Sequence, residues 1–197
     1  SLRDDAMRID GLASSSMLFP VGASEIFRSF ELPAKGAQNT GIGFCGGVEE
    51  FNFHRYFWIV GAASRRFRPG VDITNHHADG ASVEDSLARY VKRLAGTYAC
   101  LNFVRRANGQ TSMVGRTSDA LRLGQLLVQE RAAEVGYYLT PGEHYIDFND
   151  LDGLETICRG LAGGGDAELE AVRRRGAEYF QARYSDLAVL RHMASWL

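Results

Sequence analysis

From Gly41 onward, short runs of apolar, β-prone residues alternate with longer segments in which apolar residues recur at helical spacing. Alternation of this kind is typical of βα units around a parallel sheet. The apolar runs predict strands at residues 42–45, 71–75, 98–104, 126–129 and 145–148. The pattern therefore predicts an α/β domain with a Rossmann-like parallel sheet of about five strands flanked by helices.

Start and stop signals delimit the predicted helices. A capping box of Ser82 and Asp85 begins a helix that runs to about residue 95, and Gly124 ends a short helix at residues 118–123. The segments after the last strand predict a helical C-terminal region. The remaining predicted helices are residues 50–67, 151–161, 167–183 and 185–196.

Composition and charge define the broad class. The chain has 197 residues, of which 45% are hydrophobic and 23% charged, and its formal net charge is −2. This profile is typical of a globular domain, whereas nucleic-acid binding usually requires a strongly basic surface. The longest apolar run, residues 56–63, is far shorter than the ~20 residues that cross a bilayer. We therefore expect neither nucleic-acid binding nor a membrane span.

The N-terminal region and the cysteines bear on organisation and location. In residues 1–40 the apolar residues follow neither helical spacing nor the alternation of a strand. This predicts an irregular lead-in or interdomain linker before a domain at residues 41–197. The N-terminus shows no signal-peptide pattern. Cys45, Cys100 and Cys158 lie far apart in apolar surroundings, which indicates reduced core thiols. We expect a cytoplasmic protein.

Glycines at the end of the first predicted strand are candidates for a phosphate contact. Gly41, Gly43 and Gly46 match G-x-G-x-x-G. A dinucleotide site also needs a strand before the first glycine and an acid about 20 residues later, and both are missing. We interpret Gly46 and Gly47 as a turn where backbone approaches a ligand phosphate, with a tight strand-to-helix connection as the alternative.

Polar residues after the later strands add two clusters at the edge where ligands bind in such folds. Arg105 and the loop after it are suited to bidentate contacts with a diphosphate. Arg116, Ser118 and Asp119 lie at a predicted helix start, where free N–H groups favour phosphate and the acid can accept hydrogen bonds from sugar hydroxyls. The clusters predict a nucleotide-diphosphate site, with solvated arginines and a helix-start acid as the alternative.

Weaker signals come from other polar residues. Glu130 at a strand end and His144 beside a predicted turn are candidate ligand contacts, although loop polarity explains them equally well. The histidines lack the spacing and carboxylate partners of a zinc site. Asp150 and Asp152 precede a helix, where capping explains them. We therefore predict no metal and no cofactor, with a nucleotide sugar as the substrate.

Motifs spread over residues 41–197 carry a family resemblance. They are residues 42–47 (IGFCGG), 90–92 (YVK), 99–103 (ACLNF), 115–124 (GRTSDALRLG), 126–130 (LLVQE), 144–148 (HYIDF) and 154–157 (LETI). Together they resemble the C-terminal, donor-binding half of GT-B glycosyltransferases, above all the group 1 and spore-maturation-type families. Residues 19–22 (FPVG) resemble the interdomain linker of that fold.

The resemblance implies a glycosyltransferase that moves a sugar from a nucleotide diphosphate to an unidentified acceptor. It assigns the phosphate contact to Arg116 and the ribose contact to Asp119. Two departures are that this acid is Asp where Glu is usual, and that Thr111 stands where retaining subfamilies carry the first Glu of an E-x7-E pair. The resemblance also implies an acceptor-binding N-terminal domain that is missing from this chain. The alternatives are a non-catalytic interaction module and a nucleotide-sugar epimerase that shares the fold.

Overall fold

The structure is a computed structural model. It describes residues 39–45, 71–74, 83–105, 115–162 and 167–184, together with residues 55, 57, 58, 60, 61, 65, 191 and 194. The predicted lead-in up to residue 38, most of the predicted helix at residues 50–67 and most of the predicted last helix lie outside the described residues.

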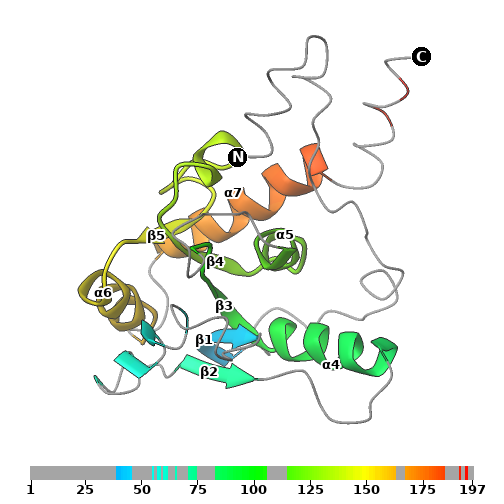
Figure 1. The fold of residues 1–197 in the computed structure, drawn as a ribbon. Coiled ribbons are helices and arrows are strands. Elements are labelled where there is room, and N and C mark those ends of the chain that lie inside the picture. Colours follow the sequence, from blue (N-terminus) through cyan, green and yellow to red (C-terminus); the bar gives the residue numbers. More distant parts are fainter. Residues whose placement is uncertain are drawn as a thin grey trace.

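All five predicted strands are present and form one parallel sheet in the order β2-β1-β3-β4-β5 (Figure 1). The chain runs from β1 outward to β2 and then returns past β1 to β3, so the strand order reverses between β1 and β3. In open α/β sheets such a reversal opens a crevice at the carboxyl ends of the two strands. The strands are β1 (Asn39–Cys45), β2 (Val71–Thr74), β3 (Thr97–Asn102), β4 (Leu126–Glu130) and β5 (Ile146–Phe148).

Helices cover both faces of the sheet (Figure 1). The described helices are α4 (Val83–Ala95), α5 (Gly115–Arg122), α6 (Leu151–Ala162) and α7 (Ala167–Tyr184), with a 3-10 turn, η2 (Val135–Tyr137), that was not predicted. Buried residues of α6 pack with one face of the strands in one apolar cluster. Buried residues of α4 and α5 pack with the opposite face in a second cluster.

The two clusters follow the alternation of side chains along each strand. In β1, Phe44 belongs to the cluster under α6, and its neighbour Cys45 belongs to the cluster under α4 and α5. In β4, Val128 and Leu127 divide in the same way. Because β1, β3 and β4 are buried on both faces, most of their residues are apolar, which made these strands recognisable as apolar runs.

Two boundaries differ from the prediction by three residues, and the other described strand and helix ends lie within two residues of it. Strand β1 begins at Asn39 rather than residue 42, so residues 39 and 40, assigned to the lead-in, belong to the strand. Helix α5 begins at Gly115 rather than residue 118. Its predicted end is confirmed, since Gly124 has a φ of 68° and accommodates the left-handed turn that follows the helix.

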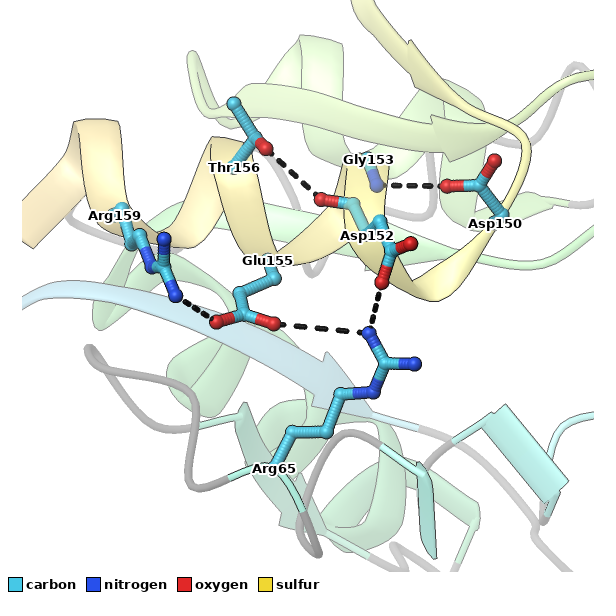
Figure 2. A network of polar contacts seen from close by, with 7 residues as sticks. All are labelled: Arg65, Asp150, Asp152, Gly153, Glu155, Thr156 and Arg159. Carbon is cyan, nitrogen blue, oxygen red and sulfur yellow. Dashed lines mark hydrogen bonds and ion pairs between the residues drawn. The ribbon is translucent and has the colours of Figure 1, made fainter.

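The start of α6 confirms that Asp150 caps a helix. The Gly153 N–H donates to Oδ1 of Asp150 at 2.8 Å. Figure 2 shows that Arg65, from the segment before β2, pairs with Asp152 and lies 3.7 Å from Glu155, which in turn pairs with Arg159. These exposed ion pairs join a distant segment of the chain to the first turns of α6, and salt is expected to screen them.

The three cysteines are buried, and Cys100 and Cys158 are free thiols. Burial raises the pKa of Cys100 to about 12 and that of Cys158 to about 11. Their thiols are therefore protonated at neutral pH and unreactive as nucleophiles, as core residues are. Among the helices that the structure describes, none has the length and apolar character needed to span a membrane.

Candidate functional site

Arg116 lies in the first turn of α5 and reaches across the carboxyl ends of β1 and β3. Its Nε donates to the carbonyl oxygen of Cys45 at 2.8 Å, and its Nη1 donates to Oδ1 of Asn102 at 2.9 Å. The guanidinium carbon lies 4.6 Å from the centre of the Phe44 ring. Cys45 ends β1 and Asn102 ends β3, so the arginine lies at the reversal in strand order.

A buried network of polar side chains contacts Arg116 through Asn102. Nδ2 of Asn102 donates to Oγ1 of Thr117 and to Oε1 of Gln129, both at 2.9 Å, and the Thr117 hydroxyl donates to the same Gln129 oxygen at 2.9 Å. Asn102 and Gln129 are fully buried, and Thr117 is 1% exposed. Asn102 and Gln129 are directly paired across β3 and β4.

Arg105 lies at the same edge of the sheet and is partly committed to Glu130. The carboxylate of Glu130 is 1% exposed and accepts the backbone N–H groups of Val104 at 3.3 Å and Arg105 at 3.2 Å. Its other oxygen lies 3.6 Å from Nε of Arg105, whose side chain is 45% exposed. Glu130, predicted as a candidate ligand contact, therefore holds the backbone that follows β3 and orients Arg105.

Asp119 has a protein partner at the end of its side chain. The Tyr90 hydroxyl, on α4, donates to Oδ2 of Asp119 at 2.8 Å. Burial raises the pKa of Asp119, although Tyr90, Arg122 and Arg116 favour the charged form.

The earlier start of α5 changes the environment of Ser118. The Ser118 hydroxyl donates to the carbonyl oxygen of Gly115 at 2.7 Å within the helix, and the residue is 4% exposed. Ser118 and Asp119 therefore lie inside α5 rather than at its start. The unpaired backbone N–H groups of the first turn belong to the residues that begin at Gly115.

His144 lies apart from the other predicted residues. It precedes β5 and so lies at the amino edge of the parallel sheet, opposite the edge that carries Arg116. Its Nδ1 accepts the Thr140 N–H at 2.9 Å, and its ring stacks on Tyr179 at 4.0 Å. Burial lowers the pKa of His144, with smaller contributions from two neighbouring arginines, whereas Glu143 opposes the shift. The histidine therefore contributes to the packing of α7.

Gly46 and Gly47 lie outside the described residues.

Sequence reasoning gave no role to three residues of the site. The motifs that carry the family resemblance include Asn102, Gln129 and Tyr90, but no role was predicted for these side chains. A signal was present, because Asn102 and Gln129 are amides in otherwise apolar strands, and buried amides must find partners. In the part of the chain that the structure describes, no cluster of three or more His, Cys, Asp or Glu residues is arranged to hold a metal ion.

Comparison with protein families identifies the class. The model of the glycosyl transferase-like family matches residues 54–194, which is most of the chain, so the chain belongs to that family. The match includes α4, α5, α6 and α7 and the four strands β2 to β5. No curated protein matches the sequence.

Two solved structures are similar to this chain, and the first of them shows the same fold. Sucrose-phosphate synthase from Thermosynechococcus elongatus aligns with a TM-score of 0.52 and 14% identity over 87% of this chain and 47% of its own. AviGT4, a glycosyltransferase involved in avilamycin A biosynthesis, aligns with a TM-score of 0.46 and 14% identity over 81% of this chain and 51% of its own. This chain thus spans about half the length of the first protein, and the likeness at this identity concerns the fold.

Proposed function

We propose that this chain is the donor-binding half of a glycosyltransferase and that the carboxyl edge of its sheet binds the diphosphate of a nucleotide sugar. The observation that carries the proposal is the place of Arg116, whose guanidinium is fixed by Cys45 and Asn102 where the strand order reverses. Ligands of open α/β sheets bind at this position. Membership of the glycosyl transferase-like family supports sugar transfer as the reaction.

Each residue of this edge has a proposed part. Arg116 and the first-turn N–H groups of α5 hold phosphate oxygens, because a helix start and a guanidinium both favour anions. The outer oxygen of Asp119 accepts a ribose hydroxyl, while Tyr90 holds the inner one. Arg105, which follows β3, also contacts the diphosphate.

The chemistry requires stabilisation of the leaving group. An acceptor hydroxyl forms a bond to the anomeric carbon, the bond from that carbon to the phosphate oxygen breaks, and the acceptor proton passes to a base. Negative charge then grows on the diphosphate, and positioned cations and N–H groups lower the energy of that state. We propose that a second domain holds the acceptor and supplies the base.

Calorimetric titration tests the proposal. UDP, GDP, ADP and dTDP are each titrated into the folded chain up to about 1 mM, the range of weak but specific affinity. We expect at least one to bind, and to bind more tightly than its monophosphate, because the second phosphate meets Arg116. Absence of binding by all of them in a sample with a cooperative unfolding transition would reject the proposal and favour a non-catalytic module.

A further inference from the structure

We propose that Asn102 is a positioning residue for Arg116, and that Thr117 and Gln129 fix the direction in which its amide points. The inference rests on the proposed function, because it concerns the arginine assigned to the donor diphosphate. Asn102 is fully buried and cannot itself reach a ligand. Its effect on binding must pass through the contact between its Oδ1 and Nη1 of Arg116.

The direction of the network follows from the chemistry of arginine. A guanidinium carries only donors at any accessible pH, so the amide atom that faces Arg116 must be the oxygen. The NH2 end of Asn102 then faces Thr117 and Gln129, both at 2.9 Å, and it needs acceptors there. The Thr117 hydroxyl accepts one hydrogen and passes its own to Gln129. Every bond in the network therefore points away from the arginine charge.

The network keeps this donor direction although one donor of Gln129 is left without a hydrogen-bond partner in the part of the chain that the structure describes. Its Oε1 accepts two hydrogen bonds, whereas its buried Nε2 has no partner among the described residues. Rotating the Gln129 amide would turn Nε2 toward Asn102, where the NH2 group is also a donor. An unsatisfied buried donor is unfavourable. Its presence indicates that the fold keeps the Gln129 oxygen against Asn102.

The two hydrogen-bond acceptors of Arg116 are uncharged oxygens, so they orient its side chain and keep its positive charge. A carbonyl oxygen and an amide oxygen hold the plane of the guanidinium without neutralising its charge. Arginine has five N–H donors, and these contacts use one on Nε and one on Nη1. Among the residues that the structure describes, no other hydrogen-bond acceptor is found for this guanidinium, and we assign the donors on Nη2 and the second on Nη1 to a phosphate. A carboxylate in place of the Asn102 amide would anchor the arginine equally well and cancel its charge.

Two substitutions at Thr117 separate positioning from packing. Thr117→Val removes the hydroxyl that orients Asn102 and keeps the shape, whereas Thr117→Ser keeps the hydroxyl and removes a methyl group. The probes are UDP, GDP, ADP and dTDP. For whichever of them binds the wild type, we expect Thr117→Val to lower the affinity by about three- to tenfold and Thr117→Ser to keep the wild-type affinity. Equal affinities for the two variants would overturn the inference.

Asn102→Asp provides a second test through charge. In this variant Gln129 can rotate so that Nε2 donates to the new carboxylate, which favours folding, while the carboxylate pairs with Arg116. We expect an unfolding temperature near that of the wild type and diphosphate affinity reduced by about tenfold or more, because the cation is neutralised. Unchanged affinity would contradict the proposed role, and this variant decides the question if Thr117→Val does not fold.

A readout without ligand distinguishes the two proposals. The Nε–H resonance of Arg116, assigned by its disappearance in Arg116→Lys, reports whether the guanidinium is held against Cys45. We expect faster hydrogen exchange at this resonance in Thr117→Val than in Thr117→Ser. If the wild type binds none of the four diphosphates but exchange differs as expected, the proposed function fails and the positioning stands. If diphosphate binds and neither affinity nor exchange differs, only the positioning fails.

Discussion

Replacing Arg116 with lysine tests the site at its central residue. Arg116→Lys keeps the positive charge and removes the planar fork. In the structure that fork contacts the carbonyl oxygen of Cys45, Oδ1 of Asn102 and the face of the Phe44 ring. An ammonium group on a flexible stem cannot hold two protein oxygens in a fixed plane and also meet a phosphate in a bidentate manner.

The expected magnitude follows from the hydrogen bonds that are lost. One charge-assisted hydrogen bond contributes about 1.5–3 kcal/mol, and each 1.4 kcal/mol is about tenfold in affinity. Arg116→Lys should therefore weaken diphosphate binding by about tenfold to about a hundredfold. The unfolding temperature should fall as well, because the buried Oδ1 of Asn102 is left without its donor.

Arg122→Lys is the matched control. Arg122 ends the same helix, and its guanidinium carbon lies 5.8 Å from the centre of the Phe180 ring rather than at the carboxyl edge. The calorimetric ligands are the diphosphate that binds the wild type and inorganic pyrophosphate, which lacks the nucleoside. Arg116→Lys should lose affinity for both, and Arg122→Lys should keep the wild-type affinity. Wild-type affinity in Arg116→Lys, or the same loss in Arg122→Lys, would refute the reasoning.

Three further predictions concern other parts of the structure. Asp119→Asn should lower the affinity for a nucleoside diphosphate by about tenfold and leave the affinity for pyrophosphate unchanged in calorimetry, because we assign the carboxylate to ribose. Equal losses of affinity for the two ligands would contradict that assignment. In Gly176→Ala, the new Cβ would lie 2.2 Å from the backbone oxygen of His144, whereas in Gly160→Ala it meets only Leu169 at 3.8 Å. Urea titration should show a loss of about 1–3 kcal/mol for the first and no loss for the second, and equal values refute the close approach. Because burial lowers the pKa of His144 from 6.5, the unfolded chain takes up the proton first as the pH falls. The free energy of unfolding should therefore fall from about pH 7.5 to about pH 5.5 more steeply in the wild type than in His144→Gln, and equal slopes contradict the burial argument.

The sheet was predictable because its strands are buried on both faces. Such strands are continuous apolar runs, and glycine and polar residues mark their ends. The start of α5 was predicted three residues too late because Ser118 and Asp119 are stronger N-terminal signals than Gly115 and Arg116. Here tertiary contacts decide the boundary, since Arg116 bonds to β1 and β3 and Thr117 is buried against β4.

The sequence predicted which edge of the sheet Arg105 and Arg116 occupy, but not the partners of the candidate site residues. The rule that ligands bind at carboxyl ends placed Arg105, Arg116 and Asp119 at one edge. The same rule excludes His144, which precedes its strand. The partners that Glu130 and Asp119 take could not be predicted, because each lies more than one element away along the chain.

Two anchored arginines at opposite edges of the sheet show how this fold distinguishes a structural cation from a binding one. At the amino edge, Arg173 donates to both carboxylate oxygens of Glu170 at 2.8 Å and to the carbonyl of Gly124, and lies over the ring of Tyr98. Its charge is neutralised within the protein, so it contributes to the docking of α7. Arg116 is held as firmly, yet its hydrogen-bond acceptors are uncharged oxygens. The fold therefore fixes the orientation of Arg116 by contacts that leave its charge available to an anion, as the proposed diphosphate site requires.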